Sequence, residues 1–195
     1  GYSDIAIGTA RLFGVRLMTN FKTPYFARDI AEFWRKWHIS LSTWFRDYLY
    51  IPLGGSRVGR AKAIRNTFAI FLVSGFWHGA NWTFIAWGFL HALLFLPLLL
   101  RAKNRRNTSE LQGLPSFREA LGMAWTFGAV VIAWVFFRAD SVGEAWNYLA
   151  GWSRPGGIAH LIPLAVILPF IPLEWWLGRK SHNGFTGDRP LQRLG

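Results

Sequence analysis

The chain has 195 residues, of which 52% are hydrophobic, and a formal net charge of +12. It contains no cysteine, which excludes disulfides, thiolate metal ligands and a cysteine nucleophile from this region. The charge alone would suit a nucleic-acid-binding protein, but the basic residues gather beside long uncharged apolar runs. That placement is typical of the cytoplasmic flanks of membrane segments, so we expect a lipid bilayer as partner and no nucleic acid.

The sequence begins Gly-Tyr-Ser-Asp, without the start expected of a membrane protein, and we expect it to be the C-terminal part of a longer polypeptide.

The first half of the chain predicts an amphipathic helix over residues 25–51. Within this range, large apolar and aromatic residues recur at spacings of three and four. They are Trp34, Trp37, His38, Leu41, Trp44, Phe45 and Tyr48. Glu32 and Asp47 are expected to be solvated charges on this helix.

Residues 67–100 contain no Asp, Glu, Lys or Arg, whereas a membrane-crossing helix needs only about 20 such residues. A straight helix of this length would be roughly 50 Å long and would exceed the hydrocarbon core of about 30 Å. Both flanks of the run are basic. We therefore predict a bent or re-entrant segment, with a cavity near the polar residues 78–81 at its middle.

Two further apolar runs, at 120–137 and 158–177, are predicted transmembrane helices, the second kinked by three prolines. The basic residues put 101–118 and the tail in the cytoplasm, and the connection 138–157 outside. The sequence thus predicts an all-α, multi-pass helical membrane protein in which residues 1–195 form a single membrane-embedded region.

Histidines within the apolar segments are the candidates for chemistry, because ionisable groups there are costly and suggest function. A neutral His78 could take a proton from an alcohol and return it to a leaving group, or it could only hydrogen-bond between helices. On a continuous helix, His91 would point roughly 220° away from His78, so we expect a structural His91 and no metal site. His38 shares the aromatic stripe and could meet His78 across the cavity.

Three motifs, in the same order, resemble the membrane-bound O-acyltransferase family, and more narrowly its bacterial alginate O-acetyltransferase-like branch. They are residues 1–8 (GYSDIAIG), 29–55 (DIAEFWRKWHISLSTWFRDYLYIPLGG) and 74–82 (SGFWHGANW). Residues 134–139 (WVFFRA) are similar to a later segment of the family, and Phe76 stands where Leu is more usual.

The resemblance implies a partial MBOAT fold in which His78 is the catalytic general base and His38 is a second histidine of the same reaction chamber. Trp77, Asn81 and Trp82 would shape that chamber or bind substrate. The expected reaction moves an acetyl group to hydroxyls of an extracytoplasmic polysaccharide such as alginate. It needs no bound cofactor, but it needs an acyl donor, acetyl-CoA or another acetyl carrier, as a substrate.

The resemblance also implies the bacterial inner membrane as location and periplasmic acetyltransferase proteins as partners. Two alternatives stay open at this point. Within the family, the acceptor could be teichoic acid, with D-alanine as the acyl group, or cellulose or another exopolysaccharide. Outside it, the chain could be a transporter fragment with His78 in a proton path, which paired broken helices in two symmetric halves would favour.

Overall fold

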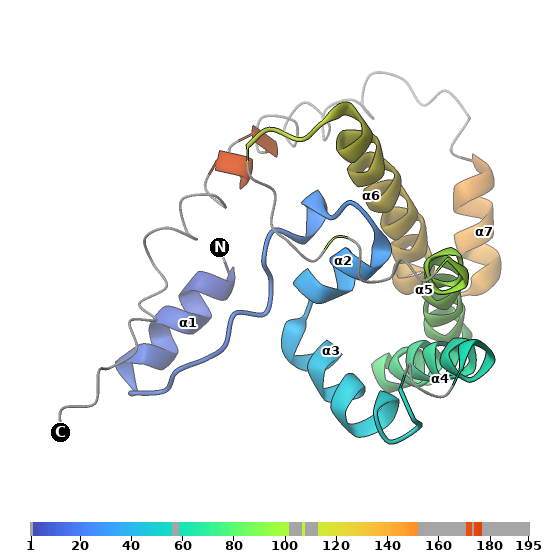
Figure 1. Cartoon of the computed structure of the whole chain (residues 1–195), viewed down its shortest axis with the longest axis horizontal. Coiled ribbons are helices and arrows are strands. Elements are labelled where there is room, and N and C mark those ends of the chain that lie inside the picture. Colours follow the sequence, from blue (N-terminus) through green and yellow to red (C-terminus); the bar gives the residue numbers. More distant parts are fainter. Residues whose placement is uncertain are drawn as a thin grey trace. The chain divides into compact units, whose positions relative to one another are not determined.

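All regular secondary structure in the described part of the chain is helical, as predicted (Figure 1). The computed structural model describes residues 2–55, 59–101, 107, 113–151, 171–172 and 174–176. The chain forms two compact units, Gly1–Ser153 and Arg154–Gly195. The predicted helix at 158–177 lies outside the described residues except for 171–172 and 174–176, so the fold below is that of the first unit.

The long apolar run is a pair of helices, α4 (Arg60–His78) and α5 (Trp82–Leu100). They pack antiparallel and very closely: a Cβ added to Gly75 would overlap the carbonyl oxygen of Phe84, and one added to Gly88 would overlap that of Phe71. The segment predicted as bent or re-entrant is thus two helices with a break at residues 79–81. The hairpin brings both basic flanks of the run to the same end of the helix pair. This explains why the two flanks did not define an orientation of the run across the membrane.

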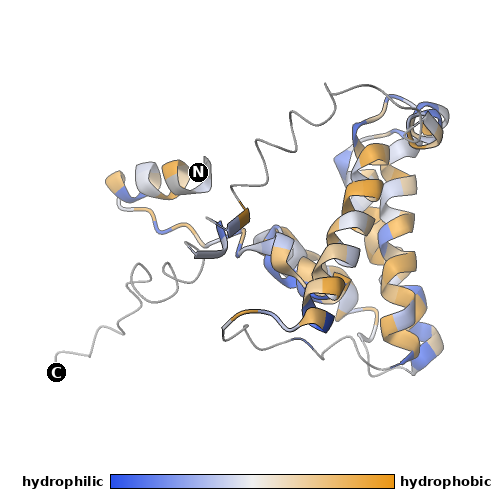
Figure 2. Cartoon of the chain, turned by 90° about the horizontal axis from the view of Figure 1, so that it is seen from above, coloured by the Kyte–Doolittle hydropathy of each residue, from blue (hydrophilic) through white to orange (hydrophobic). Residues whose placement is uncertain are grey.

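Among the described residues, two helices are long and apolar enough to cross a membrane, α5 and α6 (Phe117–Arg138). Ser116 caps α6 reciprocally with Glu119, which fixes where that helix begins. Only 28% of each apolar window is buried within the protein, whereas a core helix of a soluble protein would be mostly buried. Figure 2 shows hydrophobic residues over most of the length of the long helices. The helix α6 contains the predicted segment 120–137.

The segment predicted as one helix over 25–51 is divided into four elements, and the single amphipathic helix was wrong. These are η1 (Pro24–Phe26), α2 (Ile30–Lys36), α3 (Ile39–Phe45) and the π-helical η2 (Arg46–Tyr50). The break falls at His38, whose φ of 44° and ψ of 55° are left-handed. Local periodicity continues through this point, but the backbone turns because Asn20 accepts hydrogen bonds from the first N–H groups of α3.

The core lies where α2 packs against α5 and α6. Its buried apolar residues fall into two clusters, Ala27, Ile30, Phe33 and Val130, and Trp87, Ala133, Phe136 and Ala145. The second cluster includes α7 (Val142–Gly151), which contacts α5 and α6. The first helix is α1 (Tyr2–Leu12). This packing places the aromatic residues of α2 directly beside the polar face of α5.

Candidate functional site

His78 is the last residue of α4, half-buried in a group of aromatic rings. Its ring centroid lies 5.0 Å from those of Trp77 and Phe137, 5.3 Å from that of Trp87 and 6.2 Å from that of Phe84. The neighbours come from α4, α5 and α6. The side chain at the predicted reaction centre is therefore positioned by all three long helices and keeps one side accessible.

His38 lies at the break between α2 and α3, with its Nδ1 buried and no hydrogen-bond partner among the described residues. The centroid of its ring lies 5.9 Å from the ring centroid of Phe21. The backbone around it is fixed by Asn20, whose carbonyl oxygen accepts from the N–H of Ile39 at 3.0 Å and whose Oδ1 accepts from that of Ser40 at 2.9 Å. These bonds replace an N-cap side chain and hold His38 in its unusual conformation.

The two histidines interact electrostatically. Burial lowers the pKa of His78 below its ordinary value of 6.5, and charge on His38 lowers it further. His78 lies outside the two apolar helices α5 and α6. The imidazole is therefore neutral near pH 7, which is the form that can accept a proton. The described residues contain no group of three or more His, Cys, Asp or Glu side chains that could hold a metal ion.

Of the three residues predicted to bind substrate, Asn81 has a structural role. Its Oδ1 caps α5 by accepting from the N–H of Thr83 at 3.1 Å, and its Nδ2 donates to the carbonyl of Asp140 at 3.1 Å. Trp77 contacts His78, and Trp82 is 78% exposed. Asn81 thus joins the hairpin to the segment after α6, while both indoles remain accessible.

His91 lies closer to the candidate site than the sequence implied. The helical-wheel argument that separated it from His78 assumed one continuous helix, and the chain breaks at 79–81. His91 is fully buried, and its Nδ1 accepts a hydrogen bond from Trp34 Nε1 at 3.3 Å. Trp87 lies between the histidines, its ring centroid 5.3 Å from that of His78 and 4.9 Å from that of His91.

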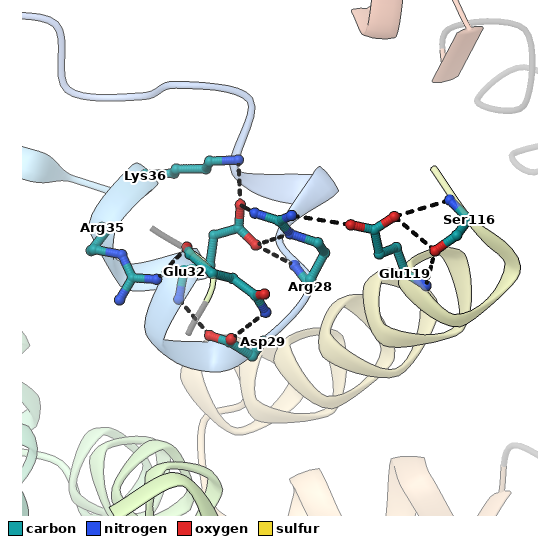
Figure 3. Close-up of polar contacts among 8 residues, drawn as sticks. Arg28, Asp29, Glu32, Arg35, Lys36, Ser116 and Glu119 are labelled. Carbon is teal, nitrogen blue, oxygen red and sulfur yellow. Dashed lines mark hydrogen bonds and ion pairs between the residues drawn. The ribbon is translucent and has the colours of Figure 1, made fainter. Parts of the chain in front are cut away.

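A charged cluster that sequence reasoning missed anchors α2 to the start of α6 (Figure 3). Glu32, expected to be solvated, is 2% exposed and accepts from Arg28 Nε at 2.9 Å and Lys36 Nζ at 2.9 Å. Arg28 also reaches Glu119 at 3.2 Å. Burial alone would raise the pKa of Glu32, but the hydrogen bonds from Arg28 and Lys36 lower it overall. The i, i+4 spacing from Glu32 to both cations was the available sequence clue.

Comparisons with known proteins found one family profile and several relatives that match this chain. The profile of the family described as MBOAT, membrane-bound O-acyltransferase family, matches residues 1–139. The "Probable alginate O-acetylase AlgI" of Pseudomonas fluorescens is 49% identical over 145 residues, which are 74% of this chain and 28% of that protein. The "Peptidoglycan O-acetyltransferase" of Helicobacter pylori is 42% identical over 161 residues, 82% of this chain and 29% of that protein.

A more distant relative is the "Teichoic acid D-alanyltransferase" of Streptococcus thermophilus, 35% identical over 152 residues, 70% of this chain and 37% of that protein. The chain therefore spans between a quarter and two fifths of the length of these relatives.

Proposed function

Because the chain belongs to the membrane-bound O-acyltransferase family, we propose that the whole protein transfers acetyl groups to hydroxyls of an extracytoplasmic polysaccharide such as alginate. The alginate assignment draws on the names of relatives that are 45 to 49% identical. The observation that carries the chemistry is His78: a neutral, half-buried imidazole at the meeting point of three long helices.

In the proposed reaction, His78 accepts the proton of the acceptor hydroxyl as its oxygen attacks the carbonyl carbon of the acyl donor. The tetrahedral intermediate then collapses, the bond to the carrier breaks, and His78 returns the proton to the leaving group. General-base assistance of this kind typically contributes about 10² to 10⁴ in rate. His38 acts on His78 through its charge and helps to position the reactants.

The charge pattern supports access from the extracytoplasmic side. Residues 101–118, which carry the basic connection between α5 and α6, are proposed to be cytoplasmic. His78 contacts Phe137 near the opposite end of α6. The proposed location is therefore the bacterial inner membrane, with His78 near the face where a polysaccharide acceptor and periplasmic acetyltransferase partners would be. The donor is an activated acetyl carrier, acetyl-CoA or another.

The test replaces His78 with Ala in the whole protein, expressed in a strain that lacks the native gene. We expect polymer acetylation, measured as acetate released by alkali per mole of sugar, to fall by at least about 100-fold. The control is His182→Ala, because His182 lies outside the residues that match the family. Full acetylation with His78→Ala at unchanged membrane abundance would refute the catalytic role.

A second acceptor has a specific observation in its favour. The peptidoglycan O-acetyltransferase of H. pylori matches a larger share of this chain than the alginate relatives do, 82% against 74 to 77%. The strain that lacks the native gene distinguishes the two possible acceptors, because the acetyl content of each polymer can be measured in it. Loss of acetyl groups from purified exopolysaccharide supports the first, and loss from purified peptidoglycan supports the second.

A further inference from the structure

Three buried polar side chains follow one face of α5 on successive turns: Thr83, Trp87 and His91. Their exposed fractions are 1%, 3% and 0%. Thr83 Oγ1, Trp87 Nε1 and His91 Nε2 have no hydrogen-bond partner among the described residues. A buried unsatisfied donor costs about 1–3 kcal/mol, and several in one row require an explanation.

The hydrogen bond from Trp34 defines which nitrogen of His91 carries the proton. Trp34 Nε1 can only donate, so His91 Nδ1, which accepts this bond, has no hydrogen. The hydrogen of the neutral ring is therefore on Nε2. Trp87 Nε1 is also exclusively a donor. One face of α5 thus carries two buried N–H groups on residues one turn apart, and neither has an acceptor among the described residues.

Trp87 lies next to the proposed reaction centre, and His91 lies next to Trp87. The ring centroid of Trp87 is 5.3 Å from that of His78 and 4.9 Å from that of His91, so one indole contacts both imidazoles. Phe33, Trp34 and Phe71 also pack against the ring of His91, which is fully buried. Preorganised donors in a water-excluded site stabilise the negative charge that develops on a carbonyl oxygen during acyl transfer.

We propose that Trp87 Nε1–H and His91 Nε2–H form a donor pair for the carbonyl oxygen of the acyl donor. The inference rests on the proposed acyl transfer and assigns a further part of its site. When the acceptor hydroxyl attacks, the carbonyl π electrons move to this oxygen, and the two N–H groups stabilise the resulting oxyanion. When the carbonyl re-forms, the bond to the carrier breaks and the carrier leaves with the proton from His78. Trp34 is the positioning residue that fixes the tautomer of His91.

The first experiment compares His91→Gln with His91→Leu in the whole protein. Both variants lack the Nδ1 acceptor for Trp34, but glutamine can place an amide N–H near the position of Nε2, whereas leucine has no donor. We expect His91→Leu to lower the rate of polymer acetylation per mole of folded membrane protein by about 10²- to 10³-fold. We expect His91→Gln to recover at least tenfold of that loss.

The second experiment removes the other donor with Trp87→Phe, with Trp146→Phe as the control because Trp146 is an exposed tryptophan of α7. We expect a loss of about 10²- to 10³-fold for Trp87→Phe and none for the control. Wild-type rates in Trp87→Phe, or equal rates in His91→Gln and His91→Leu, would overturn the proposal. If Trp87→Phe lowers only the melting temperature and not the rate, the donors hold a structural water, and the proposal is also overturned.

The gene-deletion strain keeps this inference distinct from the proposed function. If that strain still acetylates its polysaccharides fully, the proposed function fails, and the donor pair fails with it. If acetylation is lost in the deletion strain and restored equally by wild type and by Trp87→Phe, only the donor pair is refuted.

Discussion

His38 has a left-handed backbone conformation, which is uncommon for residues other than glycine, although Asn, Asp and His adopt it more often than most. A strained residue persists where its surroundings over-determine it, and here the two hydrogen bonds to Asn20 do so. The imidazole at this break packs against Phe21, and its charge lowers the pKa of His78. At the scale of single residues, the electrostatic effect of His38 on His78 supports the proposed pairing of the two histidines, which helical spacing alone did not indicate.

The pH dependence of the reaction tests this relationship. The pKa of His78 is lowered, so the rate should rise with pH and reach its plateau from a midpoint below 6.5. In His38→Asn, which tolerates the left-handed conformation, the loss of the nearby charge should raise the pKa of His78 and shift the midpoint upward. The measurement is the initial acetylation rate of the whole protein between pH 5 and 8. A midpoint that does not move would show that His38 does not act through its charge.

At the scale of elements, the α4–α5 hairpin decides the geometry of the site. Gly75 and Gly88 allow the two helix backbones to touch, which brings the end of α4, with His78, against Trp87 on α5. Asn81 then caps α5 and connects the hairpin to Asp140. The close approach of backbones explains why glycines are present in helix interiors, where they otherwise cost stability.

We expect Gly75→Ala and Gly88→Ala to destabilise the protein, because each new Cβ would overlap a carbonyl oxygen that can move only with its helix. Overpacking of this kind costs typically about 1–3 kcal/mol. Gly128→Ala in α6 is the matched control: its Cβ meets none of the described residues within 4 Å, so it should stabilise the helix by about 0.5–1 kcal/mol. Thermal unfolding of the purified whole protein measures all three. Equal melting temperatures for the three variants would contradict the close packing.

At the scale of the whole first unit, the charged cluster around Glu32 connects segments that are far apart in sequence. Arg28 contacts both Glu32 and Glu119, and Glu119 is 91 residues away from Arg28 in the sequence. A Cβ added to Gly122 would lie 2.8 Å from the carbonyl oxygen of Arg28, so α6 approaches this segment closely. The cluster holds the start of α2 against the start of α6. Since α2 leads into His38, the cluster also fixes the element from which the second histidine extends.

Glu32→Gln should therefore destabilise the protein by about 3–5 kcal/mol, because it removes the buried carboxylate that pairs with both Arg28 and Lys36. The pKa of Glu32 is lowered, so its stabilising contribution is complete above 4.5 and is lost as the pH falls through the lowered value. The melting temperatures of wild type and Glu32→Gln should accordingly converge below pH 4.5. Asp47→Asn is the control, since its ion pair with Arg46 is exposed and its loss should change little. Parallel melting curves at all pH values would contradict this assignment.

Local patterns in the sequence were sufficient to indicate the helical class, the membrane-type apolar segments and the family motifs that make His78 a candidate, because each depends on composition or on residues adjacent in the chain. The break at His38, the hairpin within 67–100, the burial of Glu32 and the contact of Trp87 with both His78 and His91 depended on tertiary structure. Each arises from contacts between distant segments: Asn20 with α3, Gly75 and Gly88 with the opposite helix, Arg28 with Glu119, and Trp34 with His91. Periodicity describes which face a residue occupies on its own helix, whereas only the packing of helices determines what that face meets.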